Sequence, residues 1–195
     1  METNNVVKIS LPWYKVWLDA LTRPFVAVYE NFLQDIHATP KRAYVWLVIS
    51  GMISGIISAF AQPPQGGISP IILATCSAPF LAIVVVISII VIAGLIQLLA
   101  QVLGGTGTYS KLVYALATFN APTTIISGLL LLIPYGLWIN AVVGVYWAIL
   151  SVIAVKAVHQ FEWRKAIIAT LPVILLAILL IIVTPWLVTF TASLK

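Results

Sequence analysis

Two histidines and three carboxylates are the side chains in this sequence whose chemistry could build a metal site or an acid–base pair. His37 lies close to Glu30 and Asp35 along the chain, and His159 lies close to Glu162. Imidazole and carboxylate groups ligate metal ions and exchange protons near neutral pH. Nothing in their spacing requires such a site, so we expect no catalytic residue, no metal and no cofactor.

The glycine-rich stretch Gly104–Gly107 is a second chemical candidate, because glycine loops can cradle phosphate groups. It lacks a preceding strand and the Lys–Ser/Thr pair of a phosphate loop, so it favours a flexible turn. No serine has a recognisable general base and oxyanion donor, and neither does Cys76, the single cysteine. The sequence therefore indicates a protein that is not an enzyme.

Polar side chains on one face of a long apolar stretch are the third candidate. They follow helical spacing and are Asn120, Thr123, Thr124 and Ser127. They could line a pore or a small-molecule pocket, since polar groups at membrane depth need partners. Alternatively they form hydrogen bonds between helices that offset a kink at Pro122, with Ser151 as one expected partner.

Composition shows what must position these residues. Of 195 residues, 62% are apolar and 8% charged, and the mean hydropathy is +1.13. Soluble domains are about 45–50% apolar and about 25% charged, so the bilayer must be the solvent for most of this chain. This excludes a sizeable soluble catalytic domain and a nucleic-acid binder. The net charge of +5 is instead typical of membrane orientation and anionic-lipid attraction.

The predicted fold is an all-α polytopic membrane protein with five transmembrane helices, because a span takes about 20 helical residues. The expected spans are 43–61, 79–102, 112–133, 137–155 and 166–190, within a transmembrane domain of residues 43–195. A single helix over 71–101 would be roughly 46 Å long. Residues 68–78 are therefore expected to form a short interfacial or re-entrant lead-in.

Residues 1–42 are expected to form a cytoplasmic amphipathic arm. Apolar residues recur at helical spacing in two stretches separated by Pro24, which predicts two short helices. The first apolar stripe includes Trp13 and Trp17, and Glu30 and Asp35 lie on the polar side of the second. Such helices lie in the headgroup plane or pack on the protein itself.

The distribution of basic residues predicts the orientation. All Lys and Arg residues except Lys195 fall on one side of the five spans. Because basic loops stay in the cytoplasm, we expect a multi-pass cell-membrane protein with a cytoplasmic N-terminus and an extracytoplasmic C-terminus. Six residues mark the expected cytoplasmic face, which would bind membrane lipids or a soluble protein: Trp17, Arg23, Pro24, His159, Glu162 and Arg164.

Small residues form a ridge along the first span. Gly51, Gly55 and Ala59 recur every four residues, with Ser54 beside them. Such ridges let helix backbones approach closely in lipid. The ridge either packs inside the chain, with the similar face around Gly144 as a natural mate, or forms an interface with a second copy or another membrane protein.

Three segments together resemble the prokaryotic branch of the Ypt-interacting-protein (YIP) membrane family. They are Trp17–Phe25 with its Arg-Pro step, Gly104–Tyr109 followed by Lys111, and the loop Val158–Ala166. The resemblance implies a five-span protein with this orientation. Eukaryotic relatives act in vesicle traffic and bind Rab-type GTPases. Their acidic Asp-Leu-Tyr-Gly-Pro motif is absent before the first span here, so GTPase binding is not carried over.

These features predict a non-enzymatic scaffold or adaptor of the YIP type that associates through small-residue helix faces. The alternative is a passive permease or channel-like protein that uses the face around Asn120 and Thr124. The middle of each span lacks ionisable side chains, which disfavours an active transporter. A lipid enzyme ranks last.

Overall fold

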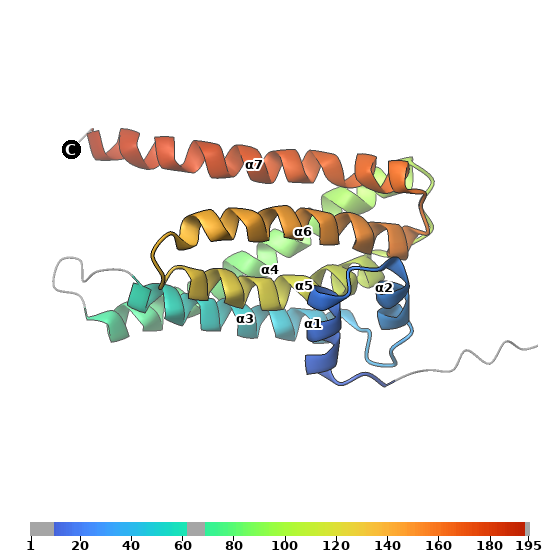
Figure 1. Cartoon of the computed structure of the whole chain (residues 1–195), viewed down its shortest axis with the longest axis horizontal. Helices are drawn as coiled ribbons and strands as arrows, with labels where there is room; N and C mark the ends of the chain where they lie inside the picture. The colour runs from blue at the N-terminus through green and yellow to red at the C-terminus, as the bar shows by residue number, and fades with distance from the viewer. Residues whose placement is uncertain (1–9, 62–68, 194–195) are drawn as a thin grey trace, which may run out of the picture.

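A computed structural model describes the backbone of residues 10–61 and 69–193, and side chains up to residue 179 except that of Leu137. The all-α prediction is confirmed for these residues (Figure 1). The seven helices are α1 (Trp13–Thr22), α2 (Val26–Leu33), α3 (Pro40–Ala61), α4 (Pro70–Val102), α5 (Tyr109–Leu130), α6 (Gly136–His159) and α7 (Trp163–Ser193).

Four of these helices are long and apolar enough to cross a membrane: α3, α4, α5 and the Trp138–His159 part of α6. This supports an integral membrane protein. The expected fifth span, 166–190, falls on α7. Because most of its outer half lies outside the described side chains, the total of five spans stays a prediction.

Helix α5 is the centre of the bundle. All residues from 112 to 123 are buried, and α5 contacts α1, α2, α3, α4 and α6. Ala115, Ala117 and Ala121 alternate with larger side chains along this buried stretch. Such small residues let neighbouring helices approach a central helix closely from several sides.

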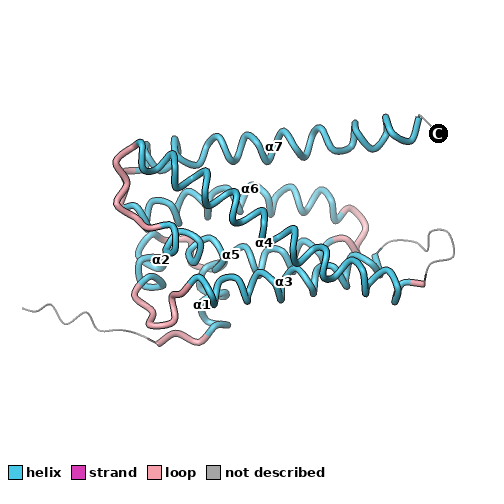
Figure 2. Tube along the Cα trace, turned by 180° about the vertical axis from the view of Figure 1, so that it is seen from behind, coloured by secondary structure: helices cyan, strands magenta, loops and turns pink. Residues whose placement is uncertain are grey.

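Helix α4 differs from the expectation of a separate lead-in before Pro79. It is one continuous helix of 33 residues that runs through Pro79. At about 1.5 Å per residue it is longer than the hydrocarbon core, so it must tilt, and Figures 1 and 2 show it crossing the bundle obliquely. Contact with α3 holds the turn before Pro79 in line, since the Ser77 hydroxyl donates to the Gly55 carbonyl over 2.8 Å.

The small-residue ridge of α3 packs against α4 of the same chain. A Cβ added at Gly51 would lie 2.6 Å from the Ala82 Cα, and one added at Gly55 would lie 2.6 Å from the Ala78 Cα. The prediction that the ridge packs against the face around Gly144 is wrong, because a Cβ added at Gly144 would meet nothing within 4 Å. At both glycines, the atoms nearest to an added Cβ are backbone atoms of α4.

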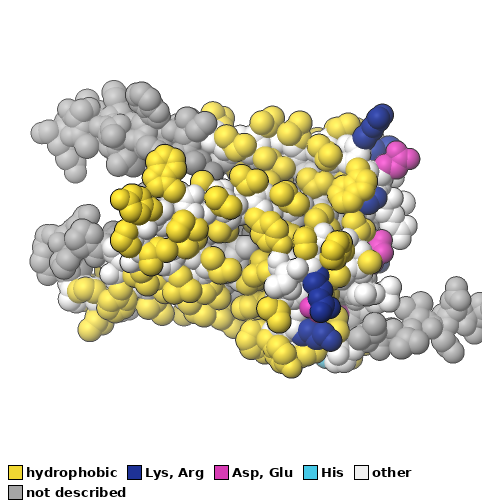
Figure 3. All heavy atoms as spheres, in the orientation of Figure 1, with side chains coloured by type: hydrophobic (Ala, Val, Ile, Leu, Met, Phe, Trp, Pro, Cys, Tyr) yellow, Lys and Arg dark blue, Asp and Glu magenta, His cyan; other side chains and the backbone are white. Residues whose placement is uncertain are grey.

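The charged residues gather at one end of the bundle (Figure 3). The described basic residues lie in α1, in the connections beside it, or in the adjoining turns of the long helices: Lys15, Arg23, Lys41, Arg42, Lys111, Lys156, Arg164 and Lys165. The α6–α7 connection and the two short helices lie at this same end (Figure 1). We refer to it as the charged end.

Replacing Gly55 by Ala should lower the Tm in detergent, because the added methyl group meets backbone atoms of α4 that can move only if the helices separate. Overpacking of this kind costs about 1–3 kcal/mol. Gly94→Ala is the matched control, since a Cβ there meets nothing within 4 Å and alanine favours helix. Equal Tm shifts in the two variants would contradict the close contact.

Candidate functional site

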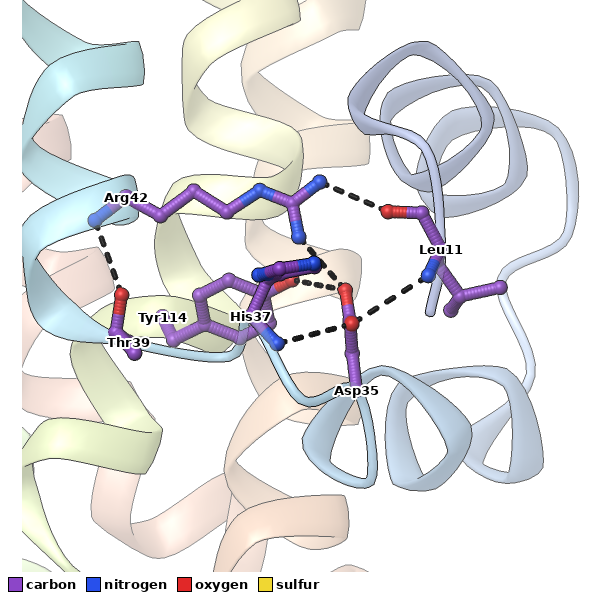
Figure 4. A network of polar contacts seen from close by, with 6 residues as sticks. All are labelled: Leu11, Asp35, His37, Thr39, Arg42 and Tyr114. Atoms are coloured by element: carbon purple, nitrogen blue, oxygen red, sulfur yellow. Dashed lines mark hydrogen bonds and ion pairs between the residues drawn. The ribbon is translucent and has the colours of Figure 1, made fainter. Parts of the chain in front are cut away.

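A buried carboxylate joins the N-terminal helices to the spans. The Asp35 side chain is fully buried and forms an ion pair with Arg42, Nη1 to Oδ2 at 2.7 Å. Its Oδ1 accepts from the backbone N–H of His37 at 3.0 Å and of Leu11 at 3.4 Å, and the Tyr114 hydroxyl donates to Oδ2 at 3.4 Å (Figure 4). The prediction that Asp35 lies on a solvated polar face is therefore wrong.

The Arg42 guanidinium extends this network. Its Nη2 donates to the Leu11 carbonyl at 2.9 Å, just before α1 (Figure 4). It also lies over the Trp46 ring, 4.7 Å from the centroid, and Trp46 packs edge-on against Trp17 of α1. One guanidinium thus contacts the segment before α1, the α2–α3 connection and α3.

Tyrosine hydroxyls donate hydrogen bonds to carbonyl groups at the C-terminal end of α1, because these carbonyls lack partners within the helix. The Tyr29 hydroxyl of α2 donates to the Ala20 carbonyl at 3.3 Å, and the Tyr146 hydroxyl of α6 donates to the Leu21 carbonyl. Burial raises the pKa of Tyr29, so its phenol stays protonated and can keep donating. The arm therefore packs on the protein itself.

Helix α1 and the connections before and after α2 nevertheless expose large apolar and aromatic side chains. Val16 and Ala20 of α1 are buried, whereas the opposite side of that helix faces outward. The exposed large apolar side chains are Trp13, Tyr14, Leu18, Phe25 and Ile36, with Tyr14 60% and Phe25 65% exposed. We call this surface the arm face.

The glycine-rich connection is a packing surface. Gly104 has φ +82°, and the Gly104 and Gly105 N–H groups donate to the Gln101 and Ala100 carbonyls, a Schellman arrangement that ends α4. A Cβ at Gly107 would lie 2.6 Å from the Val158 carbonyl oxygen. Glycine here permits close approach to α6, so the interpretation as a simple flexible turn is incomplete.

His159 holds this connection in place. Its Nδ1 accepts from the Gly107 N–H at 3.2 Å, its ring stacks on Phe161, and it is 2% exposed. The Gln97 amide of α4 donates to the Gly107 carbonyl at 3.0 Å. His159 therefore lies inside the charged end, although we expected it on the cytoplasmic surface.

The other residues expected on the cytoplasmic face have varied environments. Arg23, Glu162 and Arg164 are exposed, and Trp17 and Pro24 are half-buried. Arg23 pairs with Asp19 at 3.7 Å. Within residues 10–61 and 69–179, His, Cys, Asp and Glu side chains form no group of three or more that could hold a metal ion.

The polar face of α5 hydrogen-bonds to α6. The Trp147 indole donates to the Asn120 side-chain oxygen at 2.8 Å, and the Ser127 hydroxyl donates to the Asn140 side-chain oxygen at 2.7 Å. The expected partner Ser151 bonds its own helix instead, one turn further along α6. The Thr123 hydroxyl donates to backbone carbonyls of α5.

Comparison with known protein families matches residues 18–184 to the Yip1 domain. This chain belongs to the Yip1 domain family. The matched region runs from α1 into α7 and includes Asp35, Arg42 and Tyr114, the glycine-rich connection and the polar face of α5. Comparisons with curated proteins and with solved structures find no match. The family assignment agrees with apolar helices that identify an integral membrane protein of this type.

A signal for the buried carboxylate was present in the spacing of α2. Tyr29, Phe32 and Asp35 follow one another at intervals of three residues, so Asp35 continues the buried stripe. A carboxylate on such a stripe needs a cation to offset desolvation. Arg42 at the start of the first span is the nearest basic residue that becomes largely buried.

Replacing Arg42 by Gln should lower the free energy of unfolding by about 3–5 kcal/mol, because it leaves the Asp35 charge buried without a cation. The matched control is Arg23→Gln, which removes an exposed pair worth about 0–1 kcal/mol. Chemical unfolding in detergent micelles, followed by far-UV circular dichroism, measures both.

The double variant Asp35→Asn/Arg42→Gln should recover part of the loss, since no unpaired charge then remains in the site. If Arg42→Gln were as mild as Arg23→Gln, Asp35 would not depend on its ion pair.

Proposed function

We propose that this protein is a non-enzymatic scaffold or adaptor of the membrane, whose charged end faces the cytoplasm and binds a soluble protein. The observation that carries the proposal is the arm face, which is exposed although its helices are tied to the spans. Asp35, Arg42 and Tyr146 form those ties through buried or half-buried contacts. A pre-positioned aromatic surface loses little conformational freedom on binding, which favours docking.

The composition of the arm face supports a protein partner. Aromatic residues are enriched in the centres of protein interfaces, and arginine is enriched with them. Trp13, Tyr14 and Phe25 supply the aromatic area, and Arg23 lies on the connection between α1 and α2. Glu162 and Arg164 add exposed charges of both signs at the same end of the bundle.

The charge distribution supports the proposed orientation. The described basic residues lie at the charged end, and the opposite ends of α3, α4, α5 and α6 carry apolar or uncharged residues. Basic segments next to a membrane span are retained in the cytoplasm. In this orientation, cytoplasmic proteins can reach the arm, the α4–α5 connection and the α6–α7 connection.

The roles of the histidines support a non-enzymatic function. His159 uses Nδ1 to accept from Gly107 and lies stacked on Phe161, which is a structural role. His37 uses its backbone N–H, with its side chain exposed beside the Asp35 network (Figure 4). A general acid or base must lie within hydrogen-bond reach of its substrate. The free Nε2 of His159 is buried inside the charged end, so a substrate does not reach it in this arrangement.

Self-association through the ridge of Gly51, Gly55, Ser54 and Ala59 is a weaker route to assembly. Gly51 and Gly55 already contact α4, and Ser54 lies against Gly128 of α5. A second copy would have to displace these contacts. We therefore place partner binding on the arm face.

The passive permease is the second candidate, and the polar face of α5 is its support. Asn120 and Ser127 form hydrogen bonds to α6, so two of the four candidate lining residues already stabilise the helix pair. A conducting path would have to break or bypass these bonds. The adaptor proposal requires no such rearrangement.

A photoreactive amino acid in place of Tyr14, in the full chain in its native membrane, tests the adaptor. We expect covalent adducts with a cytoplasmic protein, because Tyr14 points outward from a fixed helix. The matched control position is Ile71, which is 71% exposed on α4 far from the charged end and should yield lipid adducts alone.

Leu18→Glu, one turn along from Tyr14 on the same exposed side of α1, should reduce the protein adducts without changing the Tm. Lipid adducts alone at position 14 would show that the arm face is buried in headgroups, and the adaptor proposal would fail.

A further inference from the structure

A recess opens into the side of the bundle at the middle of the membrane-spanning region. Its volume is about 340 Å³, and residues of four helices line it. The lining residues are Ser54, Leu81, Val85, Asn120, Thr123, Thr124, Ser127, Asn140, Val143, Gly144 and Trp147. Asn120 and Trp147 lie halfway along α5 and α6, and Thr124 to Ser127 extend the recess toward the α5–α6 turn.

We propose that this recess binds an uncharged lipid that carries a hydroxyl or ester carbonyl group and enters sideways from the bilayer. The proposal goes beyond the adaptor function, which uses the charged end. It also differs from a permease, because the ligand enters and leaves through the same side of the bundle.

The recess is open to lipid along one side. Gly144 and Val142 of α6 are exposed, and Thr124, Ser127, Asn140 and Val143 are half-buried. Helices that are exposed at this depth face acyl chains, because no water is present in the hydrocarbon core. The occupant must therefore come from the membrane.

Free hydrogen-bonding groups in the recess point to a polar ligand. Asn120 and Ser127 are paired with α6, as described above. Among the residues that the structure describes, the Thr124 hydroxyl and the Asn140 amide nitrogen have no hydrogen-bond partner in the chain. Polar groups in hydrocarbon are costly unless they are bonded. A ligand hydroxyl can accept from the Asn140 amide and can donate to or accept from the Thr124 hydroxyl, and an ester carbonyl can accept from either.

The absence of charge in the lining selects the class of lipid. The recess is lined by amide, hydroxyl, aliphatic and indole side chains, and its eleven lining residues include no Lys, Arg, His, Asp or Glu. A phosphate or ammonium group would lose its hydration there without gaining a counter-ion. An uncharged head group avoids that cost.

The size of the recess suits part of a lipid molecule rather than a whole one. Small-molecule pockets have volumes of about 300–1,000 Å³, so 340 Å³ holds a head group and the first part of a chain. Leu81, Val85 and Val143 provide an apolar wall for that chain. A Cβ at Gly144 would meet nothing within 4 Å, so this position leaves space inside the recess.

The test uses a diacylglycerol with a photoreactive diazirine in one acyl chain, as a trace component of phosphatidylcholine vesicles that contain the purified full chain. After irradiation, peptide mass spectrometry maps the adducts. We expect them to concentrate on α5 and α6 around the recess. Excess unlabelled diacylglycerol should remove them, and the same excess of phosphatidic acid, which adds a charged phosphate, should not.

Two variants locate the site. Gly144→Leu should fill the recess and reduce these adducts to background, while Gly144→Ala, the matched control, leaves most of the space and most of the labelling. Thr124→Val removes the free hydroxyl at nearly constant volume and should weaken labelling by about fivefold, as expected for one lost hydrogen bond. Circular dichroism and Tm confirm that each variant is folded.

Adducts spread evenly over the lipid-facing helices of the wild-type protein would overturn the proposal, and so would adducts unchanged by Gly144→Leu in a folded variant. Equal displacement by phosphatidic acid would overturn the claim that the ligand is uncharged. Adduct mapping and competition on the wild-type protein decide both points without any variant, so a variant that fails to fold does not weaken the test. Neither outcome depends on whether the arm face binds a protein.

Discussion

The ion pair of Asp35 and Arg42 is the contact on which the arrangement of the charged end depends. A fully buried carboxylate is stable only when its desolvation is offset by a cation and by hydrogen bonds. Here the donors come from the segment before α1, from the α2–α3 connection, from α3 and from α5, so the charge is satisfied only when all four meet. The ion pair therefore specifies one docking geometry for two helices that are too short to be stable alone. This geometry aims the arm face outward, where the proposed partner would bind.

The spans are joined by a different kind of contact, since burial of apolar surface does not drive helices together in lipid. Close backbone approach at Gly51 and Gly55 joins α3 to α4, and hydrogen bonds of Asn120 and Ser127 join α5 to α6. Helix α5 takes part in both halves of the bundle and is buried over most of its length. The recess lies where these two modes of packing meet, and its lining holds both paired and free polar groups.

Composition, helical periodicity and short motifs were enough to predict an all-α membrane protein and its family. They failed where a residue's environment depends on partners distant in sequence. Asp35 was assigned to a solvated face because its ion pair with Arg42 forms only when α2 folds back on α3. Gly51 was paired with the face around Gly144 because both are small, whereas the tilt of α4 places Ala82 against it. The continuous helix through Pro79 was missed for the same reason, since tilt relieves the length that argued for a break.

A distance measured in a bilayer tests the central claim, that the arm is fixed to the spans, most directly. Spin labels at Leu18→Cys on α1 and Leu129→Cys near the far end of α5, in a Cys76→Ser background, sample both parts at exposed positions. Double electron–electron resonance in lipid vesicles should give one narrow distance distribution. A broad or multiple distribution would show an arm that moves independently of α5, and would contradict a docking geometry set by Asp35 and Arg42.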